Sequence, residues 1–242
     1  MKQKQKRVDV RGHAVWPTGA NAGSQAEDDE RGLDRIIFFS DAVFAIAITL
    51  LALDIRLPPL PETVSNGDLL AALGRTWPQF LSYSISFLAI GMIWLAHHRT
   101  FRSVQRYDER LMLLNLFFLL LIGFVPFPTT VIGEYGNTVS TVFYAATMAT
   151  AGLMFALVWW HANAHGRLVA PPLSAREFRR VLLRVLWMPA VFLLSIPLAF
   201  WSPDGAKYVW LLILATVVWR PATRPGEARP HSRQGGLSHA KS

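Results

Sequence analysis

Hydrophobic residues occur along the chain in six long blocks, separated by short segments rich in charge, proline and glycine. The blocks cover roughly residues 36–55, 80–95, 111–132, 139–160, 181–200 and 208–219. A helix needs about 20 apolar residues to cross a bilayer. The last block is short by that measure, so it either starts earlier, near Trp201, or is accommodated by tilt or by local thinning of the bilayer. The pattern predicts an all-α, polytopic membrane protein with six transmembrane helices.

Prolines indicate where these helices end or bend. A proline inside a helix removes a backbone donor and clashes with the preceding turn. Three pairs of prolines lie just after the first block, within the third and within the fifth: Pro58 and Pro59, Pro126 and Pro128, and Pro189 and Pro197. We expect the first pair to stop its helix, the second to kink or end its helix, and the third to interrupt its helix.

The composition agrees with a membrane protein. Hydrophobic residues make up 52% of the chain and charged residues 17%, whereas soluble domains carry about 25% charged residues. The chain has no cysteine, which excludes disulfides, thiolate metal sites and cysteine nucleophiles. His161 and His165 have the i, i+4 spacing of a zinc-binding pair, but no third ligand accompanies them. No Walker A, GxSxG or HExxH motif is present, so we expect neither an enzyme nor a cofactor.

The two ends of the chain differ from the blocks. Residues 1–31 and 221–242 are polar and lack periodicity, and we expect both segments to be disordered, on either side of a membrane domain over residues 32–220. The net charge is +8, but the basic residues gather at the ends of blocks and are not interleaved with stacking aromatics. The chain is therefore not expected to bind nucleic acid.

Loop charges give an orientation. Lysine and arginine concentrate before the first block and after the second, fourth and sixth, while the alternate loops carry few. The positive-inside rule places basic loops in the cytosol. The basic clusters after the second, fourth and sixth blocks contain Arg99, Arg102, Arg106 and Arg110, then Arg167, Arg176, Arg179 and Arg180, then Arg220, Arg224, Arg229 and Arg233. Six spans with both termini in the cytoplasm, in the cell (inner) membrane, fit this pattern.

The first block has two different faces when it is placed on a helix. At about 100° per residue, Ile46, Leu50 and Leu53 form one stripe, with Thr49 beside them. Asp41 points about 140° away from Ile46 on the same helix. A stripe of isoleucine and leucine usually faces lipid or packs against other helices, although hydrophobic constrictions also gate some pores. No TVGYG-type carbonyl filter is present.

Asp41 lies within a membrane span, where an unpaired carboxylate costs several kcal/mol. It therefore faces protein or water. Candidate partners at the same depth lie in the second and third blocks, and we predict a buried polar network of Ser40, Asp41, Trp94, His98 and Asn115 that locks three helices together. The rival interpretation is a proton relay through Asp41 and His98, as in a proton-coupled transporter or a proton-conducting protein.

Three stretches of the sequence resemble one family. The motif R-x-x-x-F-S-D, here Arg35, Phe39, Ser40 and Asp41, precedes AVFAIAITLLALDI, and WLAHHRTF and LMLLNLFFLLLIGFVPFPT follow in the second and third blocks. These stretches closely resemble the bacterial branch of the transmembrane protein 175 family, whose members are potassium-selective channels. The resemblance covers about residues 31–132. Beyond that region, only the six-span layout and the length match.

The resemblance implies an architecture and a set of roles. Bacterial members carry one six-helix repeat per chain and assemble as homotetramers, with the first helix of each subunit lining a central pore for potassium ions. By spacing from the motif, the narrow apolar rings fall on Ile46, Leu50 and Leu53, and a threonine layer linked to selectivity falls on Thr49. The motif residues Arg35, Phe39, Ser40 and Asp41 would stabilise the helix without touching the ion. The expected partners are then other copies of the chain, the lipid bilayer and potassium.

Two charged residues and one further hypothesis remain open. Arg35 lies near the inner mouth of such a pore, where it is either paired or turned aside. Asp54 lies just past Leu53, either as part of an acidic ring that attracts cations or as a solvated helix end. A non-conducting membrane scaffold competes with both the channel and the proton-transporter interpretations.

Overall fold

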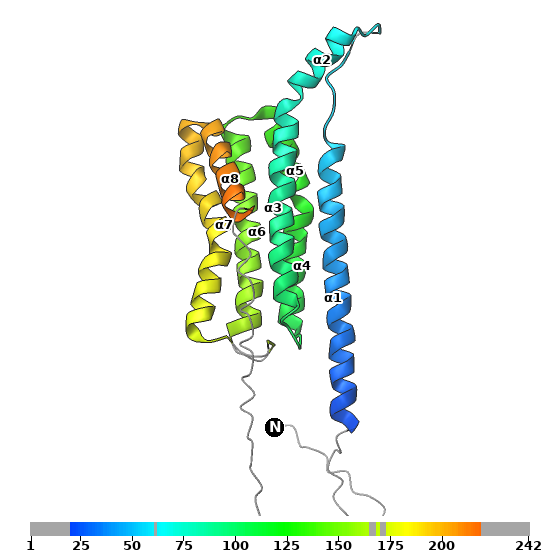
Figure 1. Cartoon of the computed structure of the whole chain (residues 1–242), viewed down its shortest axis with the longest axis vertical. Coiled ribbons are helices and arrows are strands. Elements are labelled where there is room, and N and C mark those ends of the chain that lie inside the picture. The colour runs from blue at the N-terminus through cyan, green and yellow to red at the C-terminus, as the bar shows by residue number, and fades with distance from the viewer. Residues whose placement is uncertain (1–19, 61, 165–167, 170–172, 219–242) are drawn as a thin grey trace, which may run out of the picture.

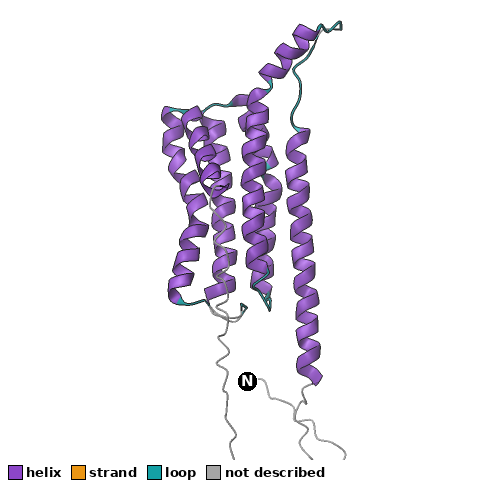
Figure 2. Ribbon diagram, viewed as in Figure 1, coloured by secondary structure: helices purple, strands orange, loops and turns teal. Residues whose placement is uncertain are grey.

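The structure is a computed structural model that describes residues 20–60, 62–164, 168–169 and 173–218 as a bundle of helices (Figures 1 and 2). In the described residues the helices are α1 (Ala20–Leu53), α2 (Asn66–Arg75), α3 (Trp77–Phe101), α4 (Glu109–Phe124), α5 (Pro126–Tyr135), α6 (Thr138–Ala164), α7 (Ala175–Trp201) and α8 (Pro203–Val218). The predicted all-α membrane fold is confirmed. Within these residues, the bundle contains no strand beyond one isolated bridge.

Five helical segments in the described part of the chain are long and apolar enough to cross a membrane. They are Glu30–Leu53, Trp77–Phe101, Glu109–Tyr135, Thr138–Ala164 and Ala175–Trp201. The short sixth block lies in α8, which begins at Pro203 and has 16 residues, fewer than the about 20 of a full span. The count of six spans therefore stays a prediction.

The N-terminal end of α1 differs from the expectation. Residues 20–31, which we expected to be disordered, already belong to α1. The segment ANAGSQAEDDER lacks proline and β-branched residues, and its three alanines, two glutamates, one glutamine and one arginine favour helix. Helix α1 therefore begins before the apolar span and continues into it without a break. Residues 1–19 and the tail 221–242 lie outside the described part of the chain.

The proline pairs have different effects. The helix breaks at Val125 between α4 and α5, so the predicted kink at Pro126 is confirmed. By contrast, α7 runs without a break through Pro189 and Pro197, where we expected an interruption. Prolines are tolerated inside transmembrane helices because neighbouring groups satisfy the backbone atoms that they free. The Ser195 hydroxyl donates to the Phe192 carbonyl at 2.7 Å, one residue before Leu193, whose carbonyl has no N–H partner at Pro197.

The loop after α1 contains α2, a helix that lies outside the six apolar blocks. Ser65 caps its N-terminus: the hydroxyl accepts from the Asp68 N–H, and the Asp68 carboxylate accepts from the Ser65 N–H. The Ser65 hydroxyl also donates to Oδ2 of Asp68 at 2.6 Å, and this bond first, then the one from the Ser65 N–H, holds the pKa of Asp68 below its usual range. The Ser-x-x-Asp spacing is visible in the sequence and is the signal that identifies this helix start.

Two of the basic loops meet at one end of the bundle. The Gln105 N–H donates to the Leu168 carbonyl at 2.7 Å, and Val104 pairs with Val169 in an antiparallel bridge. These contacts join the α3–α4 loop to the α6–α7 loop, at the same end as the start of α1 (Figure 1). Arginines that are far apart in the sequence therefore lie on one side of the membrane domain.

The contact between α6 and α7 depends on a glycine. A Cβ on Gly152 would lie 3.0 Å from Cδ and 3.1 Å from Cβ of Pro189. Those distances are shorter than van der Waals contact, so the two helices must move apart to accept a side chain here. A larger residue at this position overpacks the interface.

Gly152→Val is therefore expected to destabilise the folded protein by about 1–3 kcal/mol. Thermal unfolding in detergent, followed by tryptophan fluorescence, measures the change. Gly91→Val in α3 is the matched control, because a Cβ on Gly91 meets nothing within 4 Å. Equal melting temperatures for the two variants would contradict the close contact.

Candidate functional site

Helix α1 lies at one edge of the bundle (Figure 1). It contacts α3, α4 and α5, all of them on the same side. A helix in this position has one face that its own subunit covers and one face that it leaves open. The two faces predicted from the sequence can therefore be placed on the structure.

The covered face of α1 is formed by Ser40, Phe44, Ala47 and Leu51, each at most 2% exposed. Their spacing of four, three and four residues is that of one helix stripe. The Phe44 ring packs against Phe118 of α4, with the ring centroids 5.8 Å apart. This stripe is what fixes the rotation of α1 about its axis.

The open face of α1 carries the residues that the family resemblance assigns to a pore. Ile46, Leu50 and Leu53 are 58%, 40% and 69% exposed. Thr49 is also exposed, and its hydroxyl donates to the Ile46 carbonyl of the same helix at 2.9 Å. None of these four side chains takes part in the core of its own subunit.

A buried chain of hydrogen bonds ties α1 to α3 and α4 near the basic end of the bundle. The Asn115 amide donates to the Ser40 hydroxyl at 3.0 Å, and the Ser40 hydroxyl donates to the Ile36 carbonyl at 2.8 Å. With the amide in that orientation, its oxygen accepts from Nε2 of His97 at 2.9 Å. Each of these bonds pairs a donor with an acceptor, so Ser40, His97 and Asn115 each have a hydrogen-bond partner.

Asp41 is held separately. The Trp94 indole N–H donates to its Oδ1 atom at 2.8 Å, in a partly buried position. This bond joins α1 to α3 at the residue that follows Ser40. Asp41 therefore faces protein, and its carboxylate has a donor of the kind that lowers the cost of a charge within a membrane.

Three residues of the predicted network and of the motif beside it, namely His98, Arg35 and Phe39, lie outside this chain of hydrogen bonds. We expected His98 beside Asn115, but the neighbouring His97 occupies that position, enclosed by the rings of Phe44, Phe101 and Phe118. His98 packs on the Trp94 ring, and its buried Nδ1 has no hydrogen-bond partner in the described part of the chain. Adjacent residues on a helix differ by about 100° in direction, so only one of the two histidines can face Asn115. Packing among the phenylalanine rings places His97 in that position.

Arg35 and Phe39 are the other two. Phe39 is 53% exposed, and Arg35 is also exposed and forms no hydrogen bond or ion pair among the described residues. Phe39 precedes Ile46 by seven residues, so both lie within about 20° of each other on the open face. Within a single subunit, these two motif residues therefore stand apart from the polar network.

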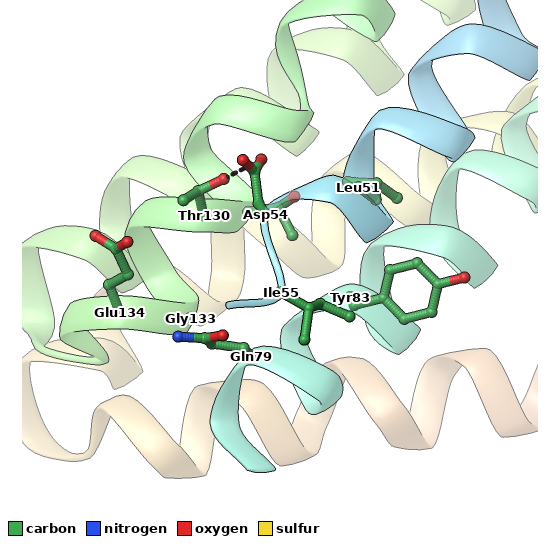
Figure 3. A pocket seen from close by; sticks show the side chains of 9 residues that line it. Leu51, Asp54, Ile55, Gln79, Tyr83, Thr130, Gly133 and Glu134 are labelled. Atoms are coloured by element: carbon green, nitrogen blue, oxygen red, sulfur yellow. Dashed lines mark hydrogen bonds between the residues drawn. The ribbon is translucent and has the colours of Figure 1, made fainter. Parts of the chain in front are cut away.

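The other end of α1 has contacts that the sequence did not predict. The Thr130 hydroxyl of α5 donates to Oδ2 of Asp54 at 2.6 Å. Two residues later, the Arg56 N–H donates to the Gln79 side chain of α3 at 3.1 Å. The three side chains Asp54, Gln79 and Thr130 line a small cavity of about 10 Å³ (Figure 3). The sequence gives no signal for Thr130, which is one of several threonines in the spans.

At the basic end, Asp108 caps α4 by accepting the Leu111 N–H at 2.7 Å. Both of its oxygens also lie 3.0 Å from Nε2 of His161. Partial burial acts to raise the pKa of Asp108, but the bonds from Leu111 and His161 outweigh it, so the pKa is lowered. Within the described residues, no three side chains of the metal-binding types come together. His165 of the predicted pair lies outside these residues.

Comparison with known proteins identifies relatives. Residues 35–126 match the family model for the endosomal/lysosomal potassium channel TMEM175. A protein of Streptomyces collinus named potassium channel is 39% identical over 173 residues, covering 69% of this chain and 82% of the relative. The mouse endosomal/lysosomal proton channel TMEM175 is 41% identical over 98 residues, covering 38% of this chain and 20% of the mouse protein.

The fold also has a solved relative. The crystal structure of a lysosomal potassium-selective channel TMEM175 homolog from Chamaesiphon minutus superposes with a TM-score of 0.68 at 31% identity, and the match covers 78% of this chain and 97% of that one. The family model includes the whole of the motif that starts at Arg35 and both faces of α1. The expected family is thereby confirmed: this multi-pass membrane protein belongs to the TMEM175 family.

Proposed function

We propose that this protein is a potassium channel in which the open faces of α1 from four copies surround one pore. The observation that carries the proposal is the exposure of Ile46, Thr49, Leu50 and Leu53 on a helix whose opposite face is buried. A single copy of α1 cannot enclose a pore. The relatives named potassium channel support the choice of ion.

Small residues on the open face support close packing of α1 with its copies. Ala42, Ala45, Thr49 and Ala52 are all exposed, at spacings of three, four and three residues. Small side chains allow transmembrane helices to approach closely. Four helices that approach in this way leave a narrow passage, and isoleucine and leucine rings in it form apolar constrictions that exclude water. Thr49 then supplies the polar layer between them.

The relay through Asp41 and His98 has less support. The partner of Asp41 is the Trp94 indole N–H, and this group donates a hydrogen bond but cannot accept one. A proton cannot pass through such a donor to His98. The name of the mouse relative nevertheless makes proton flux worth measuring beside potassium flux.

The basic end of the bundle supports an orientation. The α3–α4 and α6–α7 loops are joined there by the bond from Gln105 to Leu168. Because basic loops stay in the cytosol, we place this end and both chain termini in the cytoplasm, with the protein in the cell membrane. The Ser40 and Asp41 contacts then lie near the inner mouth of the pore, and Leu53 lies near the outer mouth.

Leu50→Ala tests the pore. We expect faster potassium flux from liposomes with a potassium gradient, because a smaller side chain widens an apolar layer and lowers its barrier to water. The matched control is Leu194→Ala, which removes an exposed leucine from α7, far from the open face of α1. A proton-sensitive dye in the same liposomes reports proton flux. Folded, oligomeric wild-type protein that passes no potassium would remove the proposal.

A further inference from the structure

Leu53, which forms the outermost layer of the proposed pore, is packed less against its own subunit than Ile46 and Leu50 are. Leu53 is the last residue of α1 and is 69% exposed. Its side chain has few neighbours in the subunit, so its position depends on how the end of the helix is held. The residue that follows it, Asp54, makes a side-chain hydrogen bond to another helix at this end.

The Asp54 contact is short and directed away from the open face. Its carboxylate accepts from the Thr130 hydroxyl at 2.6 Å, within the range of a charge-assisted O–H···O⁻ bond. Figure 3 shows the two side chains pointing toward each other between α1 and α5. Adjacent residues on a helix differ by about 100° in direction, so Leu53 faces the open side while Asp54 faces the bundle.

A second bond holds the chain after the helix. The Arg56 N–H donates to the Gln79 side chain of α3. Together the two bonds fasten residues 54–56 to α5 and to α3 at the start of the extracellular loop. Of the two, only the Asp54 bond joins a side chain next to Leu53.

We propose that Asp54 is a positioning residue that fixes the outer end of α1 through Thr130 and thereby sets the Leu53 layer of the pore. The inference rests on the proposed function, because it needs α1 to line the pore. It differs from an acidic ring, in which the charge of Asp54 would raise the local cation concentration. Positioning depends on a hydrogen bond to Thr130, whereas an acidic ring depends on charge alone.

The experiment separates these two properties with isosteric variants. Asp54→Asn removes the charge but keeps an acceptor for Thr130, while Thr130→Val removes the donor but keeps the charge. Asp54→Ala and the double variant Asp54→Ala with Thr130→Val complete the set. Thr150→Val is the matched control, because Thr150 is exposed on α6 and bonds only to its own helix. Thr130→Ser restores the hydroxyl.

We expect Thr130→Val and Asp54→Ala to change the potassium-to-sodium permeability ratio, measured by reversal potential in planar bilayers, in the same direction. The double variant should match the single variants within about twofold, because both remove the same bond. Asp54→Asn, Thr130→Ser and Thr150→Val should stay near wild type. Unequal effects of this kind would not arise from a general loss of folding.

Two results would overturn the inference while leaving the channel intact. In the first, Asp54→Asn lowers conductance as Asp54→Ala does, Thr130→Val resembles wild type, and the effect fades at high salt, as screening of a surface charge requires. In the second, every variant conducts like wild type, so Asp54 is a solvated helix end. Absence of current in wild type instead overturns the proposed function itself.

Discussion

Ile46→Asn is expected to raise potassium flux and to weaken the preference for potassium over sodium. Ile46 is 58% exposed on the open face of α1, and in the proposed pore it forms a complete apolar ring. An amide there binds water where the isoleucine side chain excludes it. A barrier lowered by about 1.4 kcal/mol raises a rate about tenfold, so we expect at least that increase.

Potassium flux from liposomes and the reversal potential under mixed potassium and sodium measure the two effects. Ile46→Leu is the control, because it keeps an apolar ring of similar volume and should retain wild-type selectivity. The folded subunit should tolerate Ile46→Asn, since Ile46 has no place in its core. Unchanged flux from folded and assembled Ile46→Asn protein would place the constriction elsewhere.

Asn115→Leu should give the largest loss of stability among single substitutions near the end of α1 that lies beside the basic loops. The leucine removes one bond from the Asn115 amide to Ser40 and one to Asn115 from His97. Ser40 and His97 are 0% and 1% exposed, so their polar atoms lose partners that water cannot replace. Each unsatisfied buried group costs about 1–3 kcal/mol, although bonds between transmembrane helices average nearer to about 0.6 kcal/mol.

We therefore expect Asn115→Leu to lower the free energy of unfolding by about 2 kcal/mol. Unfolding by a denaturing detergent, read by tryptophan fluorescence, measures it. Asn163→Leu serves as the control, because Asn163 makes a single bond to the backbone of its own helix. Combining Asn115→Leu with Ser40→Ala should cost less than the sum of the two, since both remove the same bond. Full additivity would show that Ser40 and Asn115 act independently.

The sequence predicted five spans that are long enough to cross a membrane, because bilayer thickness imposes a length that apolar blocks reveal directly, whereas the sixth span stays a prediction. It predicted the break at Pro126 for a similar reason, since the missing backbone donor acts locally. The predicted interruption at Pro189 was wrong, because α7 continues through this residue. Whether a helix continues through a proline depends on packing against neighbouring helices, which a sequence does not display. The helix α2 was missed because only its cap, and no apolar block, identifies it.

The site was predicted in part. Two faces on α1 follow from helix periodicity, and the contact of Asp41 with Trp94 lies within the predicted set. The choice of His97 over His98 was not predictable, since adjacent residues were both within reach and packing of three phenylalanine rings decided between them. Thr130 was missed because its partnership with Asp54 joins residues 76 positions apart in sequence.

The separation of covered and open faces on α1 separates the effects of mutation on stability from those on the open face. Side chains that hold the subunit together, such as Phe44 and Leu51, alternate along the helix with side chains that the subunit core does not use, such as Ile46 and Leu50. Mutations of the second kind leave the stability of the monomer nearly untouched. In the proposed pore, substitutions at a few open positions can therefore alter permeation while the subunit that presents them keeps its fold.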